Sequence, residues 1–355
     1  MADRDGNGWI RCAQGHRHWG RFGAAGLLAY VPGAAGDTAA GGNTAAGGVT
    51  PAGGDRAAGG DAVVLLQRRS SWVNHPGTWG PPGGAMDSHE SAVSAALREA
   101  AEECGVPAGA VTVGGILRDD HGGWSYQTVI AAAAAPFPVR NASDETSEVG
   151  WISEGDVGRL DLHPGFAAQW PSLRAWLAPL TVIVDVANVM GSRADGWWRD
   201  RAGAAVRLHG ELTALAARGV PALPVPLSGP LPGPVPGLVL ASLPGPVLER
   251  WFPGFVLVLE GAARAALARL PAQPDALPGT PPAGLAPDGL APDALPDASR
   301  VRVVAAAGSG DDLIADLAAR LPGHRLVVTA DRELRGRCTA AGAAVTGPRW
   351  LLGML

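Results

Sequence analysis

Lysine is absent from this sequence, cysteine occurs only three times, and no hydrophobic run reaches the length of a membrane-spanning helix. The basic side chains are arginines and histidines, and the abundance of alanine, glycine and proline is typical of a GC-rich coding bias. A transmembrane helix needs about 20 apolar residues, and the N-terminus lacks the apolar core of a signal peptide. We therefore expect no membrane partner.

The three cysteines, Cys12, Cys104 and Cys338, are widely separated. An odd number without paired spacing argues against a disulfide framework and favours a reducing, cytoplasmic location. One local pattern invites a zinc interpretation, because His16 and His18 follow Cys12. A structural zinc site has four ligands, however, and a fourth is missing here. We therefore prefer a surface or substrate-side strand to a zinc site in this segment.

The chain has 355 residues, of which 47% are hydrophobic and 17% charged. This length and composition predict two globular domains, each with its own core. The net charge of −5 argues against a broad nucleic-acid-binding surface.

Residues 84–106 carry the most informative pattern. Apolar residues recur at helical spacing, Asp87 and Glu90 form a capping-box pattern at the start, and Gly105 suits the left-handed residue that ends a helix. We therefore predict an amphipathic helix that begins near Asp87 and ends at Gly105.

Three glutamates make this helix unusual. Glu99, Glu102 and Glu103 share one face within one turn, and like charges at this spacing destabilise a helix unless something neutralises them. A hard divalent cation such as Mg²⁺ binds carboxylate oxygens of this kind. Arg98 is placed to orient Glu90 or Glu102 through a forked ion pair.

The spacing resembles the Nudix box, Gly-x5-Glu-x7-Arg-Glu-U-x-Glu-Glu-x-Gly-U, in which U is a bulky aliphatic residue. Ala100 is smaller than the usual aliphatic residue, which bears on packing rather than on chemistry. The positions in register are Gly84, Glu90, Arg98, Glu99, Glu102, Glu103, Gly105 and Val106.

This resemblance implies a Nudix α/β/α sandwich with a mixed sheet in residues 1–178. It also implies a hydrolase that cleaves the pyrophosphate bond of a nucleoside diphosphate linked to another moiety. The implied metal, Mg²⁺ or Mn²⁺, polarises the pyrophosphate and lowers the pKa of the attacking water. Its implied ligands are Glu99, Glu102, Glu103 and the carbonyl of Gly84.

The remaining implied roles belong to neighbouring residues. Glu102 or Glu148 acts as general base, whereas Arg98 and Glu90 hold the site in shape. On the substrate side, basic residues in the region of the chain that holds Arg68 and Arg69 often face the phosphates in this family, so these two arginines are candidates for substrate binding. Alternatively, they are two solvated surface arginines. Asp120 and Trp124, in a predicted hairpin, are further candidates for the substrate pocket.

The second half of the chain alternates short apolar strands with helices, which predicts a parallel α/β sheet. We place the boundary at residues 178 and 179, so the second domain covers 179–355. Residues 33–61 are rich in glycine and alanine and residues 271–299 in proline and alanine. Both are predicted to be disordered insertions.

Polar residues follow the predicted strands of this second domain, and ligands bind beyond the carboxyl ends of parallel strands. Convergent acids there could bind Mg²⁺ or Mn²⁺ and activate water against a phosphodiester. The first strand is followed by Asp185-x-x-Asn188, and Glu260, Gly-x-Gly-Asp311-Asp312 and Ala-Asp331-Arg-x-Leu come later. This order resembles that of PIN-like nucleases of the NYN type. Alternatively, these acids are helix N-caps and turn formers. The residues are Asp185, Asn188, Glu260, Asp311, Asp312 and Asp331.

Three function classes therefore stay open. The protein is a nucleotide pyrophosphohydrolase whose second domain contributes little chemistry, or an RNA-processing enzyme that trims 5′ ends and cuts chains. In the third class the second domain is an inactive binding module. The first two take a nucleotide derivative and an RNA, respectively, as substrate.

Overall fold

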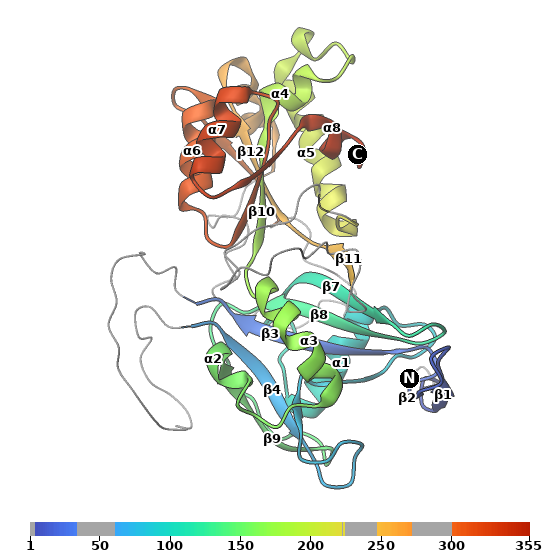
Figure 1. The fold of residues 1–355 in the computed structure, drawn as a ribbon. Coiled ribbons are helices and arrows are strands. Elements are labelled where there is room, and N and C mark those ends of the chain that lie inside the picture. Colours follow the sequence, from blue (N-terminus) through green and yellow to red (C-terminus); the bar gives the residue numbers. More distant parts are fainter. Residues whose placement is uncertain (1–3, 34–60, 222, 224–246, 272–299) are drawn as a thin grey trace, which may run out of the picture.

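The computed structural model describes residues 4–33, 61–221, 223, 247–271 and 300–355. Apart from residues 33, 61 and 271, the two predicted insertions, 33–61 and 271–299, lie outside the described residues. The described chain forms two large sheets, each covered by helices on both faces (Figure 1), and a separate two-stranded sheet.

The N-terminal sheet has the strand order β11-β7-β8-β3-β4-β5, with β6 paired to β3 and β9 paired to β4. Strands β3 and β8 are parallel and the other pairs are antiparallel, so the sheet is mixed, as predicted. Its strands are β3 (Ala24–Val31), β4 (Val63–Arg69), β5 (Trp79–Gly80), β6 (Gly83–Ala85), β7 (Thr112–Asp120), β8 (Ser125–Ala132), β9 (Thr146–Ser153) and β11 (Val247–Trp251).

Alternation along β3 explains the layers of this part. Ala25, Leu27 and Ala29 pack with helix α1 (Ala92–Cys104) on one face, whereas Leu28 and Tyr30 pack with α3 (Pro164–Leu173) on the other. Successive side chains of a strand point to opposite faces, so one buried strand serves two cores. Short elements α2 (Glu154–Val157) and η1 (Arg174–Trp176) flank α3, and β1 (Trp9–Arg11) and β2 (Arg17–Trp19) form a separate hairpin.

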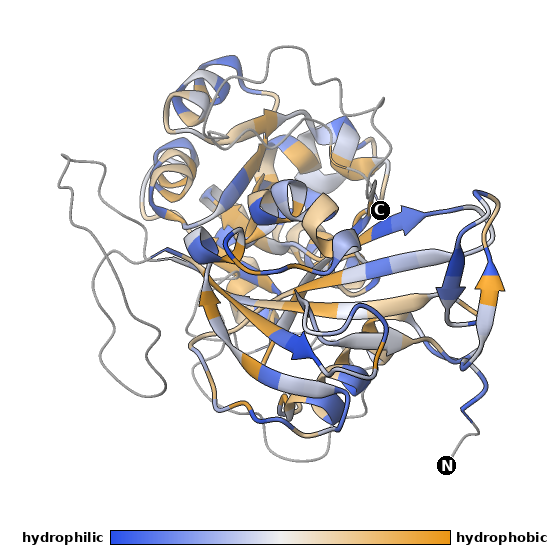
Figure 2. Cartoon of the chain, turned by 60° about the horizontal axis from the view of Figure 1, so that its bottom comes forward, coloured by the Kyte–Doolittle hydropathy of each residue, from blue (hydrophilic) through white to orange (hydrophobic). Residues whose placement is uncertain are grey.

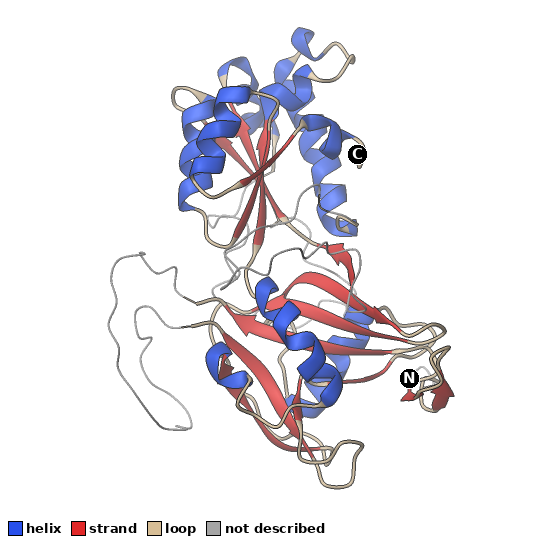
Figure 3. Cartoon of the chain, viewed as in Figure 1, coloured by secondary structure: helices blue, strands red, loops and turns tan. Residues whose placement is uncertain are grey.

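The C-terminal sheet is parallel throughout, with the order β13-β12-β10-β14-β15. This confirms the predicted parallel sheet, and Figure 3 shows its strands between two layers of helices. The strands are β10 (Leu180–Asp185), β12 (Gly254–Leu259), β13 (Val301–Ala305), β14 (His324–Val328) and β15 (Ala344–Thr346). One face carries α4 (Val186–Gly191), α5 (Arg201–Arg218), η3 (Gly261–Arg269) and α8 (Pro348–Leu352), and the other carries α6 (Gly310–Arg320) and α7 (Arg332–Ala340). The short η2 (Trp197–Arg199) precedes α5.

Strand β11 links the two sheets. It follows the predicted boundary at residue 179, yet it pairs with β7 of the N-terminal sheet. Trp251, at its end, is 1% exposed and packs on the Trp176 ring at a centroid distance of 4.9 Å. Arg300 reinforces the link, donating to the carbonyl oxygens of Phe252 at 2.6 Å and Val113 at 2.7 Å.

The hydropathy pattern agrees with this arrangement, because apolar residues are concentrated along the central strands (Figure 2). Within the part of the chain that the structure describes, none of the helices combines the length and the hydrophobicity needed to cross a bilayer.

Candidate functional site

Helix α1 begins later than we predicted. Its N-cap is Ser91, whose side chain accepts from the Ser94 backbone N–H in a capping box. Asp87 instead lies in the turn before the helix, where it accepts from the Gly6 N–H at 2.7 Å and its own N–H donates to Glu90 at 3.0 Å. The Asp87–Glu90 pair that we predicted as the capping box is therefore formed in the turn before the helix.

The end of α1 is as predicted. Gly105 adopts the left-handed conformation at φ 68°, and its N–H caps the last turn. Ala100 is fully buried against the sheet.

Glu103 is the most deeply buried of the three clustered glutamates, at 5% exposure. One carboxylate oxygen accepts from the Gln67 side-chain amide at 2.7 Å and from the Gly83 backbone N–H at 2.8 Å. Burial, followed by the nearby charge of Glu99, raises the pKa of Glu103 to about 8. Two neutral donors thus fix the carboxylate but do not compensate its negative charge.

Glu99 lies one turn earlier, and burial likewise raises its pKa. It accepts from Arg98 at 2.6 Å. The Glu99 carboxylate also lies close to the backbone of Gly84, because a Cβ added there would be 2.6 Å from the carboxyl group. Gly84 therefore permits a close approach between the strand β6 backbone and this carboxylate.

Arg98 holds the site in shape from one side. Its guanidinium donates to both oxygens of Glu90, at 2.6 and 2.8 Å, and to the Ala85 carbonyl at 3.0 Å. These hydrogen bonds from Arg98 lower the pKa of Glu90 and keep it ionised. The predicted forked ion pair is thus made with Glu90.

Glu102 is the solvent-accessible member of the glutamate cluster, with its side chain 45% exposed. It pairs with Arg4 and lies 3.5 Å from Arg98. The cluster therefore presents one accessible, one half-buried and one buried carboxylate on adjacent turns. Clustered carboxylate oxygens suit a hard divalent cation, and Glu103 has only neutral hydrogen-bond donors, so these residues fit such an ion.

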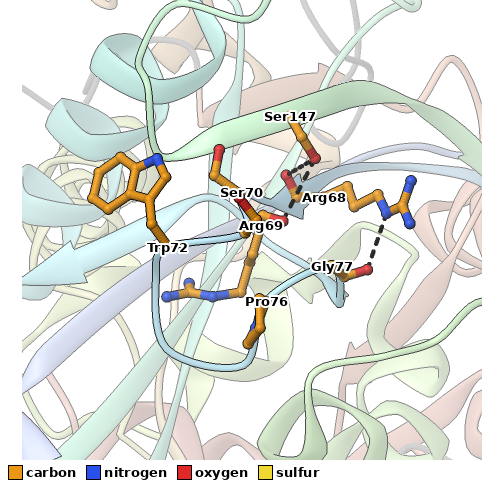
Figure 4. Close-up of a pocket in the computed structure, with 8 residues that line it drawn as sticks. Arg68, Arg69, Ser70, Trp72, Pro76, Gly77 and Ser147 are labelled. Carbon is orange, nitrogen blue, oxygen red and sulfur yellow. Dashed lines mark hydrogen bonds between the residues drawn. The ribbon is translucent and has the colours of Figure 1, made fainter.

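Arg68 and Arg69 line a surface pocket of about 470 Å³ beside the turn between β4 and β5 (Figure 4). Arg68 donates to the Gly77 carbonyl at 3.0 Å and pairs with Glu148 at 2.8 Å. Trp72, also in the lining, is 63% exposed. The pocket thus combines two guanidinium groups with an exposed aromatic ring.

This pocket is connected to the glutamate cluster through β4. Gln67 and Arg69 are two residues apart in β4, so their side chains lie on the same face of the strand. Gln67 donates a hydrogen bond to Glu103. The sequence analysis missed Gln67, although a glutamine inside an apolar strand run is the available signal. Glu145 was also missed as a neighbour, and its charge contributes to the raised pKa of Glu103.

Asp120 and Trp124 lie at the turn between β7 and β8, and neither lines the pocket with Arg68 and Arg69. Asp120 pairs with Arg118 at 3.1 Å. The Trp124 ring stacks on His18 at a centroid distance of 3.9 Å. The structure therefore divides the four predicted substrate residues between two places.

The polar residues of the second half do converge at the carboxyl edge of the parallel sheet. Burial raises the pKa of Asp311, and the charges of Asp185, Asp331 and Glu260 add to this effect. Asp185 ends the central strand β10, at the point where the strand order turns from β12 to β14. This is the position at which such sheets bind ligands.

Several of these acids also have structural partners. Asp185 is the N-cap of α4 and accepts from Asn188 and Thr329 side chains at 2.7 Å. Asp331 caps α7. Asp185 and Asp331 are therefore helix N-caps, as the alternative interpretation predicted. They nevertheless lie near the other acids of the group.

Glu260 and Asp312, two of the three other acids of this group, have partners too. Glu260 accepts from the Gly310 N–H at 3.0 Å. Asp312 pairs with Arg337 at 2.7 Å.

A family model described as NUDIX domain matches residues 46–175. The putative 8-oxo-dGTP diphosphatase 3 of Mycobacterium tuberculosis (strain CDC 1551 / Oshkosh) is 39% identical over 184 residues, which cover 50% of this chain and 72% of that protein. A nucleoside triphosphate pyrophosphatase/Nudix hydrolase fusion protein of Bifidobacterium longum is 34% identical over 177 residues, covering 49% of this chain and 32% of that protein. The crystal structure of a Nudix hydrolase from M. smegmatis, RenU, is 40% identical and covers 48% of this chain and 93% of that chain, with a TM-score of 0.38.

Proposed function

Because this chain belongs to the Nudix family, we propose that it is a Mg²⁺-dependent hydrolase of the pyrophosphate bond in a nucleoside diphosphate linked to another moiety. The supporting observation is the cluster of Glu99, Glu102 and Glu103, in which burial raises the pKa of both Glu99 and Glu103. Residues 1–178 form the catalytic Nudix domain in this proposal, with the Pro179 junction as its boundary.

The proposed metal ligands are Glu99, Glu102, Glu103 and the Gly84 carbonyl. When bound, Mg²⁺ or Mn²⁺ supplies Lewis acidity toward the phosphate oxygens and lowers the pKa of water. Arg98 keeps Glu90 and Glu99 in place, and Gln67 does the same for Glu103. Glu102 is the exposed carboxylate, so we assign it to accept the proton of the attacking water.

The substrate is proposed to reach the cluster from the pocket at the β4–β5 turn. Arg68 and Arg69 supply charge for the phosphates, and the exposed Trp72 offers a stacking surface for a base. The name of the M. tuberculosis relative makes 8-oxo-dGTP the first substrate to test.

A panel of substrates with Mg²⁺ tests this proposal. The panel holds normal and oxidised nucleoside triphosphates, ADP-ribose, dinucleotides and 5′-triphosphate RNA. We expect at least one nucleotide to be cleaved at a phosphoanhydride, with turnover abolished by EDTA. Glu103→Gln should lose at least about 100-fold in turnover, which corresponds to roughly 2.7 kcal/mol. Full activity in a folded Glu103→Gln protein would contradict the proposal.

A second candidate function rests on the convergent acids of residues 179–355. We propose that this part is a PIN-like, NYN-type ribonuclease domain, in which Asp185, Glu260, Asp311 and Asp331 approach one another at the sheet edge. Next to Glu260 lies a cavity of about 260 Å³, whose lining includes Trp197 and Arg201. An aromatic ring beside an arginine suits single-stranded RNA.

Metal-dependent cleavage of single-stranded RNA tests this second candidate. We expect cleavage by wild type and by Glu103→Gln, and none by Asp185→Asn. If wild type cuts no RNA with either Mg²⁺ or Mn²⁺, the ribonuclease proposal is wrong and the binding-module alternative gains support.

A further inference from the structure

Four side chains with nitrogen or sulfur ligand atoms meet at the edge of the N-terminal part, away from the glutamate cluster. Cys12, His16 and His18 come from the β1–β2 hairpin, and His121 comes from the turn between β7 and β8. One ligand atom from each lies within 4.8 Å of all the others. The missing fourth ligand, which led us to disfavour zinc, is thus supplied from about 100 residues later in the chain.

Backbone hydrogen bonds build this arrangement. The Cys12 N–H donates to the His16 carbonyl at 3.0 Å, which closes the hairpin turn. The Ala13 N–H donates to the Gly122 carbonyl at 2.8 Å and joins this turn to the β7–β8 turn. Gly122 has φ 73°, and a Cβ there would lie 2.7 Å from the Ala13 Cβ. Figure 1 shows the hairpin beside the tip of β7 and β8.

Two of the ring nitrogens are buried and lack a hydrogen-bond partner among the described residues, namely Nε2 of His18 and Nδ1 of His121. The other nitrogen of His121, Nε2, lies 3.3 Å from Asp119, which also accepts from Gln169 at 2.8 Å. A carboxylate that orients one histidine nitrogen while the other stays available is the usual environment of a metal-bound histidine.

We propose that Cys12, His16, His18 and His121 form a structural Zn²⁺ site. Thiolate and imidazole ligands suit zinc, whereas Mg²⁺ prefers oxygen. In a tetrahedral zinc site with bonds of 2.0–2.3 Å, neighbouring ligand atoms are about 3.3–3.6 Å apart. The four ligand atoms lie within 4.8 Å of one another, so they must come closer by roughly 1 Å to bind zinc. Small rotations of these side chains supply this movement.

Four protein ligands complete the coordination of zinc, so this site leaves no position for substrate. Its effect is to fasten the hairpin to the β7–β8 turn. The segment directly before the hairpin contacts the glutamate cluster, since Arg4 pairs with Glu102 and Gly6 donates to Asp87. Zinc would therefore steady the N-terminal segment at the edge of the proposed active site.

Metal analysis of the full chain, produced in zinc-supplemented medium without a polyhistidine tag, tests this inference. We expect one zinc ion per chain after dialysis against excess Mg²⁺. Replacement of zinc by Co²⁺ should produce the visible absorption of a tetrahedral site and a thiolate-to-cobalt charge-transfer band.

Matched variants identify the ligands. Cys12→Ser and His121→Ala should lose the bound zinc, whereas Cys338→Ser, a buried cysteine of α7, and His89→Ala, an exposed histidine outside the cluster, should keep it. Glu103→Gln should also keep its zinc, which separates this site from the proposed Mg²⁺ site. A failure of this site would thus leave the Nudix proposal untouched.

Two results would overturn the inference. One is a wild-type chain that holds no zinc and gives no thiolate–cobalt band under reducing conditions, a result that does not depend on the folding of any variant. The other is retention of stoichiometric zinc by both Cys12→Ser and His121→Ala.

Discussion

At the scale of single residues, Glu103 shows which features of the proposed active site follow from the sequence and which depend on the fold. The spacing of the glutamates predicted a shared helix face, but it could not predict how deeply each carboxylate is buried. That depends on the β4 strand, which brings Gln67 to Glu103, and on the close backbone approach at Gly84.

The raised pKa of Glu103 predicts a pH-dependent stability of the metal-free protein. An unfolded glutamate ionises near pH 4.5, whereas folded Glu103 does so at about pH 8. Between these values the folded state binds a proton that the unfolded state has lost, so stability falls as pH rises from about 5 to about 8. Thermal unfolding in EDTA should show Tm decreasing over this range.

Mg²⁺ should oppose this decrease, because the ion favours the ionised carboxylate and its binding releases a proton. Glu103→Gln removes the titrating group and should flatten both the pH slope and the response to Mg²⁺. A slope of unchanged size in that variant would show that another group is responsible.

At the scale of elements, strands and helix ends followed their local signals well. Helix α1 ends at Gly105 as predicted, and the second half forms the parallel sheet that its alternating strands and helices predicted. The start of α1 differs because Asp87 and Ser91 are both good caps, and Asp87 is already used by Gly6. Local sequence does not reveal a partner that lies about 80 residues away.

Gly105→Ala tests the helix end. A residue with a Cβ in the left-handed conformation costs about 1–2 kcal/mol, and here the Cβ would also lie 3.2 Å from Arg140. We expect a loss of stability of this size by chemical denaturation. Gly150→Ala is the control, because its Cβ would meet nothing within 4 Å and its φ lies outside the left-handed region. Equal losses in the two variants would contradict the assigned cap.

At the scale of the whole molecule, the contacts that sequence could not predict join distant segments. Strand β11 lies well inside the predicted second domain, residues 179–355, yet its partner is β7 of the N-terminal sheet. His121 completes the four-ligand cluster in the same way. By contrast, the convergence of Asp185, Glu260 and Asp311 was predictable, because parallel strands bring their carboxyl ends to one edge.

Trp251→Ala tests whether β11 stabilises the molecule as a whole. Removing a fully buried tryptophan that packs on Trp176 should cost about 3–5 kcal/mol, measured from the shift of the guanidinium unfolding curve. Trp198 is 57% exposed, so Trp198→Ala should change stability by less than about 0.5 kcal/mol. A similarly small effect at Trp251 would mean that the link between the sheets contributes little.

The most direct test of the central claim is a side-by-side product analysis of wild type, Glu103→Gln and Asp185→Asn, with 8-oxo-dGTP and Mg²⁺. We predict that wild type and Asp185→Asn release the nucleoside monophosphate at comparable rates, while Glu103→Gln is slower by at least about 100-fold. Equal hydrolysis by a folded Glu103→Gln protein, or a loss confined to Asp185→Asn, would place the chemistry outside the glutamate cluster and contradict the account.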